Sequence, residues 1–219
     1  MFAEVNGVRI FYEVQGAGRP LVLLHGNAED HRIFDKAAPL LSSRFTVYTP
    51  DTRGHGQSRY TGALHYTDMA GDAAAFIRRL GLEKPILYGF SDGGITALLT
   101  ALQAPALLSA VVASGANTHP KGVKTRFYLG LWLHCRFSRS PFLQLMLHEP
   151  HITPGMLGGI TVPVHLTAGS RDLIRRSHTQ ALHAAIPGST LKIFEGEDHG
   201  SYICHSEKIA EYLLGLFAK

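Results

Sequence analysis

One stretch near the middle of the chain restricts the possible fold more than any other feature. Residues 85–88 are an apolar run suited to a buried strand, and residues 95–102 are rich in Ala and Leu, which favours a helix. Between them, residues 89–93 have the pattern Gly-x-Ser-x-Gly. A strand that turns directly into a helix leaves no room for side chains two positions before and two positions after the central residue of the turn, here Ser91. The same turn strains the backbone of that residue and holds its hydroxyl clear of the sheet. The pattern predicts a tight turn that presents Ser91 as a nucleophile beside the free amides of a helix N-terminus.

Two other kinds of turn have a similar pattern: a structural Gly-rich turn and a phosphate-binding loop. The serine could be incidental in a structural Gly-rich turn, but a strand before and a helix after are what a nucleophile turn requires. A phosphate-binding loop would need Lys followed by Ser or Thr at the start of the helix. Gly94 and Ile95 stand there instead.

The rest of the chain alternates between strand and helix patterns. A hairpin with an Asn-Gly turn is expected over residues 2–12. From residue 21 onward the alternation predicts a mostly parallel sheet with helices on both faces, whose ligands bind beyond the carboxyl ends of the strands. Strands are expected at 21–24, 45–48, 85–88, 107–114, 162–168 and 191–194, and helices at 33–41, 67–80, 95–102, 177–186 and 206–217.

Two further polar groups follow predicted strands at the carboxyl edge of this sheet. Asp172 lies just after the strand at 162–168, and His199 follows the strand at 191–194. The order Ser, Asp, His is that of a catalytic triad in which His199 takes the proton of Ser91 and Asp172 orients the imidazole. Glu197 and Asp198 are local rivals for the acid, but they adjoin His199 in sequence and are poorly placed to face its Nδ1.

The oxyanion of such a reaction would be held by backbone amides. We expect these to belong to Asn27, in the loop after the strand at 21–24, and to Asp92, directly after the nucleophile. The chain has 13 His residues, so most are structural or on the surface. His25 is expected to shape the oxyanion loop and His55 to hydrogen-bond locally, while Asp51 and Arg53 belong to a structural turn.

Together these motifs resemble the α/β-hydrolase superfamily, in its serine-hydrolase branch. The likeness rests on His25-Gly26, Asp51-x-Arg53-Gly54-x-Gly56-x-Ser58, the turn at 89–93, Gly169-x-x-Asp172 and His199. It implies an α/β fold with a mostly parallel eight-stranded sheet, an acyl-enzyme mechanism and no cofactor. The likeness covers residues 1–116 and 160–219, which are expected to form the core, while residues 117–159 would be a short helical cap insertion.

A narrower likeness concerns residues 89–98 and the later Gly115-Ala116-Asn117. These resemble the biphenyl-hydrolase-like family, which includes the valacyclovir hydrolases. In that family the acid after the nucleophile is linked to recognition of the amino group of α-amino esters, and Asp92 matches that position. A carboxylate is also favoured at any helix N-terminus. We expect Asp92, Gly26 and Asn117 to contact the substrate.

The segment that interrupts the alternation is basic. Between Asn117 and His148 there are five Lys or Arg residues and no acid, and residues 128–133 and 142–147 are strongly apolar. An amphipathic lid with its cations in water is the simplest interpretation. There are two functional alternatives: the segment could attract anionic substrates, such as acyl-CoA phosphates, or an acidic membrane surface. Both compete with an amine-binding role of Asp92.

Composition excludes several classes of protein. A chain of 219 residues with a net charge of +4 suits one globular domain, and no nucleic-acid motif is visible. Two cysteines without a CxxC pattern suggest free thiols and no zinc site. No leader and no apolar run long enough to span a membrane were found, so we expect a cytoplasmic protein with no integral membrane segment. No metal is expected, and the oligomeric state is not indicated.

These observations predict a serine hydrolase of carboxylic esters, with thioesters, lactones and α-amino esters as further candidate small-molecule substrates. A C–C bond hydrolase with the same triad is one alternative, and a non-catalytic ligand-binding or receptor protein of the same fold is another. Nucleophilic-Asp dehalogenases and epoxide hydrolases are disfavoured because Ser91 occupies the turn.

Overall fold

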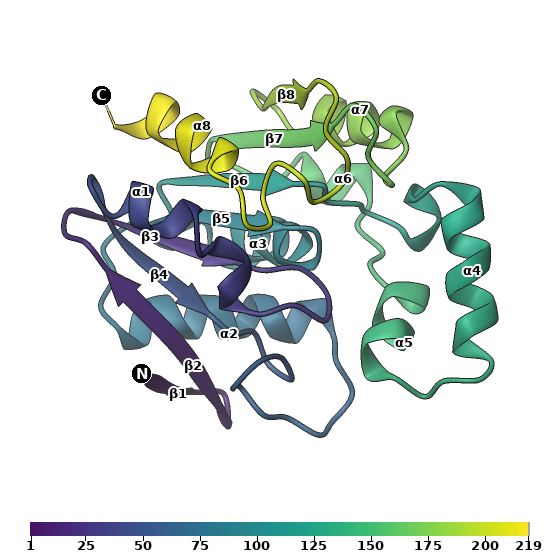
Figure 1. The fold of residues 1–219 in the computed structure, drawn as a ribbon, viewed down its shortest axis with the longest axis horizontal. Helices are drawn as coiled ribbons and strands as arrows, with labels where there is room; N and C mark the ends of the chain where they lie inside the picture. The colour runs from purple at the N-terminus through teal and green to yellow at the C-terminus, as the bar shows by residue number, and fades with distance from the viewer. Residues whose placement is uncertain (219) are drawn as a thin grey trace.

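The computed structural model describes residues 1–218, which form one eight-stranded sheet with helices on both faces (Figure 1). The strand order is β1-β2-β4-β3-β5-β6-β7-β8. β1 pairs with β2 and β2 with β4 in antiparallel fashion, whereas the pairs from β4 through β8 are all parallel. The predicted α/β-hydrolase fold with a mostly parallel eight-stranded sheet is confirmed. The strands are β1 Phe2–Val5, β2 Val8–Gln15, β3 Arg19–Leu24, β4 Phe45–Pro50, β5 Ile86–Phe90, β6 Ala110–Ser114, β7 Val164–Gly169 and β8 Thr190–Phe194.

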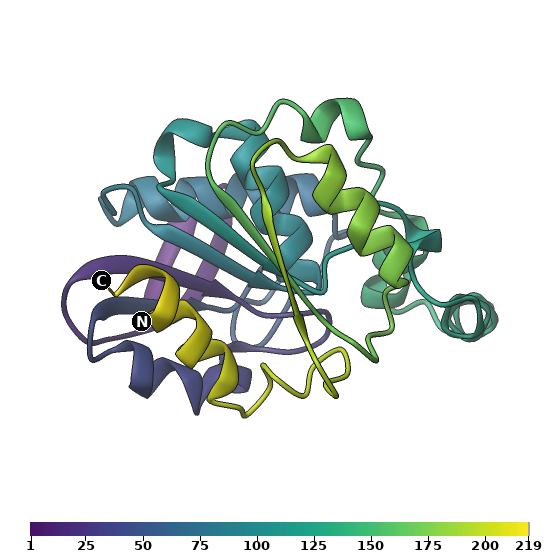
Figure 2. The ribbon, with the colours of Figure 1, turned by 90° about the horizontal axis from the view of Figure 1, so that it is seen from above.

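Helices lie on both faces of the sheet (Figure 2), and the buried side chains form two separate hydrophobic cores. The central strands β5 and β6 are buried along their whole length, as strands covered on both faces must be. One core contains the inward faces of α2 Tyr66–Arg79, α3 Asp92–Gln103 and α7 Arg176–Ala185. The other contains η1 His31–Phe34, α1 Ala37–Leu41 and α8 Lys208–Phe217.

Two predicted elements were wrong in their extent. The helix expected over 33–41 is two short pieces, η1 and α1. Pro39 explains the break, because a continuous helix would set its ring against the carbonyl of Asp35, whereas a helix that starts at Ala37 holds Pro39 in its first turn. The strand expected over 107–114 begins at Ala110, and the residues before it form the 3-10 turn η2 Pro105–Leu107.

The segment between β6 and β7 contains several short helices, two of which add Leu145 and Leu157 to the core that includes α2, α3 and α7. The helices of this segment are η3 Pro120–Gly122, α4 Thr125–Cys135, α5 Pro141–His148 and α6 Pro154–Leu157. α4 and α5 pack against each other beyond the carboxyl end of the sheet, and α4 is the outer of the two (Figure 1). Within residues 1–218, no helix combines the length and the apolar composition needed to cross a bilayer.

A buried ion pair anchors the turn that follows β4. Arg53 donates through Nε and Nη2 to the two carboxylate oxygens of Asp72 in α2, at 2.6 and 2.7 Å. Both residues are about 95% buried. Asn6 Nδ2 also donates to Asp72, at 3.0 Å, so the pair joins the first hairpin, the turn and α2.

We predict that Arg53→Met lowers the free energy of unfolding by about 3–5 kcal/mol, because it leaves the Asp72 carboxylate buried without its cation. The double variant Arg53→Met/Asp72→Leu should recover most of that loss. Urea unfolding measures both, with Arg79→Met on the exposed face of α2 as the control for loss of one positive charge. Equal losses from Arg53→Met and Arg79→Met would contradict the structural role of the pair.

Candidate active site

The turn from β5 into α3 has the geometry that its glycines imply. Ser91 has φ 53° and ψ −114°, a backbone conformation that costs a non-glycine residue about 1–3 kcal/mol. A Cβ atom at Gly89 would overlap the carbonyl of Gly93, and one at Gly93 would overlap the carbonyl of Leu24 at the end of β3. Side chains are therefore excluded at both positions, and the strained serine is held at the carboxyl edge of the sheet.

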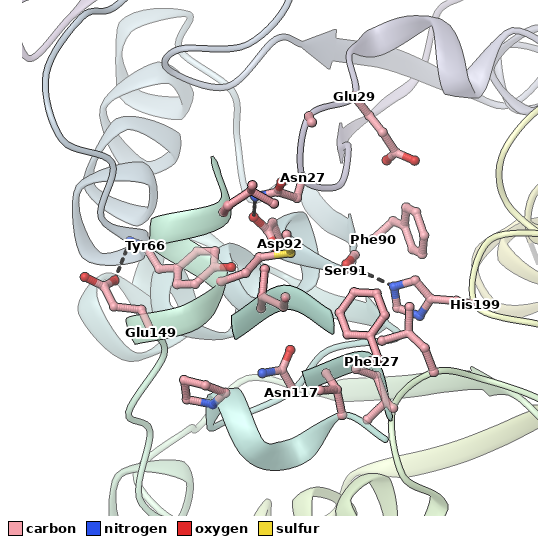
Figure 3. A pocket seen from close by; sticks show the side chains of 18 residues that line it. Asn27, Glu29, Tyr66, Phe90, Ser91, Asp92, Asn117, Phe127, Glu149 and His199 are labelled. Carbon is pink, nitrogen blue, oxygen red and sulfur yellow. Dashed lines mark hydrogen bonds between the residues drawn. The ribbon is translucent and has the colours of Figure 1, made fainter. Parts of the chain in front are cut away.

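The side chains of Ser91, His199 and Asp172 form a continuous chain of hydrogen bonds, of which Figure 3 shows the one between Ser91 and His199. Nε2 of His199 lies 3.0 Å from Oγ of Ser91, and Nδ1 lies 2.7 Å from Oδ1 of Asp172. A carboxylate only accepts, so Nδ1–H donates to Asp172 and Nε2 of the neutral ring accepts from the serine hydroxyl. Three loops separated widely in sequence thus place a hydroxyl, an imidazole and a carboxylate in one line.

The surroundings of His199 favour this one orientation. Asp172 is 4% exposed and also accepts the backbone N–H of Ile174, at 2.9 Å. Gly115 has φ +60°, and a Cβ there would lie 2.8 Å from Cε1 of His199, so only glycine lets the ring approach. The two rival acids point elsewhere: Glu197 pairs with Lys208 and Ser201, and Asp198 accepts the amides of Gly200 and Ser201.

Two backbone amides near Ser91 are free to bind an anion. Within residues 1–218, neither the amide of Asn27 nor that of Asp92 donates a hydrogen bond to another protein group. The loop that carries Asn27 is held by Glu29, whose Oε2 accepts the N–H of Gly26 at 2.9 Å. Burial raises the pKa of Glu29. The two amides predicted for the oxyanion are therefore available, and the contact of Glu29 with the loop that carries Asn27 was not predicted from the sequence.

His25 and His55 have structural partners. Nδ1 of His25 lies 2.8 Å from the carbonyl of Gly26, and its Nε2 accepts the amide of Thr52 at 3.0 Å. Burial lowers the pKa of His25 to about 4, so its ring is neutral at physiological pH. Nδ1 of His55 lies 3.0 Å from the carbonyl of Arg53. His25 thus bonds within the loop that is predicted to hold the oxyanion, and His55 bonds within its own turn, as predicted.

A cavity of about 350 Å³ opens beside Ser91 and His199 (Figure 3). Its volume is at the lower end of the range for small-molecule sites. Most of its wall is apolar, and α4 and α5 supply Phe127, Leu131, Leu143 and Met146 to it. The charged groups in the wall are all acidic apart from the imidazole of His199: they are Glu29, Asp92 and Glu149.

The Asp92 carboxylate is buried in this wall without a cationic partner. Its Oδ2 accepts from Nδ2 of Asn27 at 2.7 Å, and the Tyr66 hydroxyl faces the same group (Figure 3). Burial raises the pKa of Asp92 to about 6, although the hydrogen bonds from Asn27 and Tyr66 oppose the shift. A negative charge close to a forming oxyanion opposes its formation unless the charge points away or is neutralised. The structure turns the carboxylate toward Asn27.

The other two predicted substrate contacts differ in position. Asn117 lines the cavity, and its Nδ2 donates to the carbonyl of His119 at 2.9 Å. Gly26 is not among the residues that line it, and its amide is engaged by Glu29. The wall also contains Tyr66 and Glu149, which were not predicted. Glu149 accepts the backbone N–H of Tyr66 at 3.1 Å, and no local motif signals a contact between residues so far apart in sequence.

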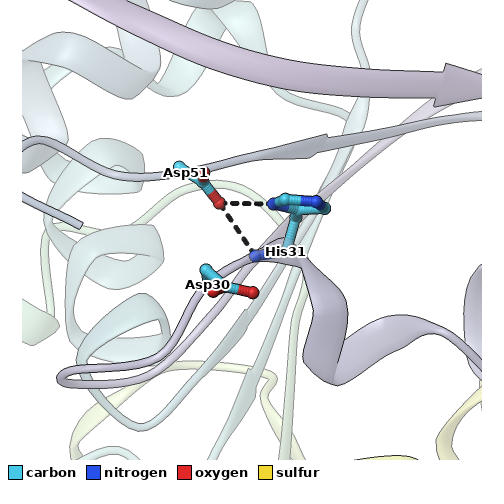
Figure 4. Close-up of side chains that lie close together, drawn as sticks. All are labelled: Asp30, His31 and Asp51. Carbon is cyan, nitrogen blue, oxygen red and sulfur yellow. Dashed lines mark hydrogen bonds and ion pairs between the residues drawn. The ribbon is translucent and has the colours of Figure 1, made fainter. Parts of the chain in front are cut away.

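Three potential metal ligands lie together outside this cavity, namely Asp30, His31 and Asp51 (Figure 4). Asp51 accepts both the backbone N–H and Nδ1 of His31, at 2.9 and 2.7 Å, and its other oxygen accepts the N–H of Gln57 at 2.8 Å. Asp30 accepts from Arg32 at 2.9 Å. The cluster is therefore accounted for by contacts that fasten the start of η1 to the turn after β4.

Comparison with known proteins agrees with this architecture. The family model described as alpha/beta hydrolase fold matches residues 19–134, just over half of the chain. The human protein called serine hydrolase BPHL is 28% identical over 247 aligned positions, which cover 96% of this chain and 84% of the relative. Because this chain has only 219 residues, the relative carries at least 28 residues without a counterpart here.

Solved structures of low sequence identity share the fold. An enol-lactonase from Burkholderia xenovorans LB400 superposes with a TM-score of 0.82 at 18% identity, and each chain is covered completely. A thermophilic esterase from Thermogutta terrifontis gives a TM-score of 0.82 at 20% identity, covering 99% of this chain and 96% of that one. Fold, family match and relatives lead to one conclusion: the chain belongs to the α/β-hydrolase family, and it is a hydrolase.

Proposed function

We propose that this protein is a serine hydrolase that cleaves carboxylic esters through an acyl-enzyme intermediate. The observation that carries the proposal is the hydrogen-bond chain from Ser91 through His199 to Asp172, with bonds of 3.0 and 2.7 Å. A serine hydroxyl is a weak nucleophile until an adjacent base takes its proton, and an imidazole oriented by a carboxylate is the base that this chemistry uses.

In the first step, Oγ of Ser91 attacks the ester carbonyl while Nε2 of His199 takes the hydroxyl proton. The amides of Asn27 and Asp92 stabilise the oxyanion, where one donor contributes on the order of 3–4 kcal/mol. Asp172 stabilises the imidazolium that forms. The C–O bond to the leaving group then breaks, and His199 returns its proton to the departing alcohol.

In the second step, water takes the place of the serine hydroxyl. His199 removes a proton from the water, whose oxygen attacks the acyl carbon, and the bond to Oγ of Ser91 breaks with return of the proton to Ser91. The carboxylic acid is released and the enzyme is regenerated. The sequence supplies all the groups for this cycle, so no cofactor enters it.

Residues 117–159 act in this proposal as a short cap, with residues 1–116 and 160–219 as the core. The cap closes the cavity with the apolar side chains of α4 and α5, which suits a small acyl group. Lactones are cyclic esters open to the same steps, and two structural neighbours are described as an enol-lactonase and an N-acyl homoserine lactone degrading enzyme. We therefore propose lactones and thioesters as further substrates.

The acidic wall of the cavity favours acyl groups that carry an ammonium group. Asp92 is buried, it has no cationic partner, and Glu29 and Glu149 lie in the same wall. A substrate ammonium would supply the missing charge and offset the burial of the carboxylate. A preference for α-amino esters follows.

We predict that Ser91→Ala and His199→Ala each lower kcat for ester hydrolysis by a factor on the order of 10⁶, and that the double variant loses no more, because the two groups act as a unit. A serine-directed fluorophosphonate should label the wild type and not Ser91→Ala. His134→Ala, an exposed histidine of α4, is the matched control. Labelling of Ser91→Ala, or additive losses in the double variant, would refute the assigned roles.

We predict that Asp92→Asn changes how stability depends on pH. The folded-state pKa of about 6 exceeds the ~3.9 of an unfolded Asp, so the folded protein loses stability as pH rises from about 4 to 6. The loss is on the order of 2–3 kcal/mol and is complete above about pH 6. The variant lacks this loss, so its unfolding free energy relative to the wild type should be higher at about pH 7.5 than at about pH 4. Urea unfolding at both pH values tests this, and an equal difference at each would contradict it.

We predict a pH-dependent preference for α-amino esters over their des-amino analogues. The ratio of the two kcat/KM values should rise as Asp92 ionises near pH 6 and fall above about pH 8, where the substrate amine loses its proton. Titration of the catalytic base affects both substrates and cancels in the ratio. Asp92→Asn should lower the ratio by roughly 10–100-fold. A ratio near one at all pH values would remove the amine preference and leave the esterase proposal intact.

A further inference from the structure

α4 presents two different faces. On one side Phe127 and Leu131 line the cavity next to His199. The other side carries Leu129, Trp132 and Leu133, which are 56%, 45% and 54% exposed, and Phe137 just beyond the helix is 84% exposed. A helix that needed only to close the cavity would carry polar residues on its outer side. The outer side of α4 is apolar instead.

Apolar exposure is concentrated on this helix. Among residues 1–218, eleven large hydrophobic side chains are exposed, and five of them lie between Phe127 and Phe137. Of the other six, Met1, Phe2 and Val14 lie on the first hairpin, and Leu40, Tyr60 and Met156 are single residues elsewhere. Single exposed apolar residues are ordinary on a soluble protein, whereas a cluster of them marks a surface that contacts something.

Cations surround this apolar face. Arg126, Arg136 and Arg139 are exposed, and no acidic residue occurs from Asn117 to His148. The guanidinium of Arg136 lies 5.1 Å from the centre of the Trp132 ring. Helices that lie in the interface of an anionic bilayer have this composition, with leucine and tryptophan bordered by arginines.

The position of α4 allows such a contact. In both views α4 is at the periphery of the molecule, with its packing partners α5 and η3 on its inner side and no element over its outer face (Figures 1 and 2). A flat surface could therefore reach α4 without meeting the sheet or its covering helices.

We propose that the outer face of α4, formed by Arg126, Leu129, Trp132, Leu133, Arg136 and Phe137, docks the protein onto the surface of an anionic lipid bilayer. The helix lies in the plane of the membrane, its leucine and aromatic side chains enter the headgroup region, and the arginines meet lipid phosphates. This binding site lies beyond the proposed hydrolase function and does not depend on it.

Charge disfavours a second copy of the chain as the occupant of this face. A twofold contact through α4 would bring its arginines toward those of the other copy, and the segment contains no acid that could pair with them. An anionic lipid surface offers the complementary charge over the whole face.

Trp132 is the only tryptophan in the chain, so its fluorescence reports directly on the proposed face. Vesicles of phosphatidylcholine containing roughly one third phosphatidylglycerol should shift its emission to the blue, and brominated acyl chains should quench it. Pure phosphatidylcholine vesicles should bind far more weakly, and added salt should weaken binding to the anionic ones. Ser91→Ala should bind like the wild type, which separates this result from the fate of the hydrolase proposal.

Paired variants separate the two contributions. Arg126→Gln/Arg136→Gln should lower the partition coefficient by about 25-fold, since each cation near the bilayer contributes roughly fivefold. Arg78→Gln/Arg79→Gln on α2 changes the net charge equally and should leave binding unchanged. Leu129→Ser/Leu133→Ser should weaken binding by about tenfold or more, while Leu40→Ser/Met156→Ser, at exposed sites on other helices, should not.

Four results would overturn the proposal. The first is unchanged Trp132 emission with anionic vesicles, and the second is equal binding to neutral and anionic vesicles at all salt concentrations. The third is self-association in analytical ultracentrifugation that Leu129→Ser/Leu133→Ser abolishes, which would make the face a contact between copies. The fourth is a Trp132 response to poly-glutamate but not to vesicles, which would indicate an acidic protein partner.

Discussion

The turn between β5 and α3 is so tight that two of its positions, Gly89 and Gly93, exclude any side chain, and the rest of the site depends on that constraint. Gly89 and Gly93 let the backbone of α3 approach β5 and the end of β3. Ser91 bears the resulting strain at φ 53°. The sheet offsets this cost, since β5 is paired on both sides and the amide of Ser91 itself donates to the carbonyl of Ser114, at 2.8 Å. The strained backbone of Ser91 is thus held by β5 and β6, two strands that are buried along their whole length.

The wall of the cavity and the segment that covers it carry opposite charges. The cavity wall holds three carboxyl groups and no Lys or Arg, whereas the segment from Asn117 to His148 holds five cations and no acid. In the sequence, an amine-binding role of Asp92 and an anion-binding role of the basic cap are competing interpretations, because they require opposite charges on one ligand. In the structure, Arg126 and Arg136 of α4 are exposed and do not line the cavity that contains Asp92. Each charge can therefore act on its own partner.

Much of this could be predicted from the sequence because the signals are local. The glycines around Ser91 and the apolar strands fixed the sheet, and the carboxyl ends of parallel strands must meet at one edge, which brought Asp172 and His199 to Ser91. Glu29, Tyr66 and Glu149 were missed because their approach to the cavity depends on contacts such as that between Tyr66 and Glu149, which no short motif records. The helix expected over 33–41 was wrong because an apolar period was given more weight than Pro39.

In the proposed reaction Asp92 and Asn27 would link recognition to catalysis, because each would contribute in two ways. Their backbone amides are the free donors near Ser91, and their side chains bond to each other at 2.7 Å, which ties the loop after β3 to the start of α3. An ionised Asp92 so close to a forming oxyanion would oppose the reaction unless its charge is matched. A cation bound at Asp92 would cancel that repulsion. It would also contact the carboxylate whose hydrogen bond with Asn27 holds the two amides in position. The same carboxylate would then select the substrate and set the field in which the oxyanion forms.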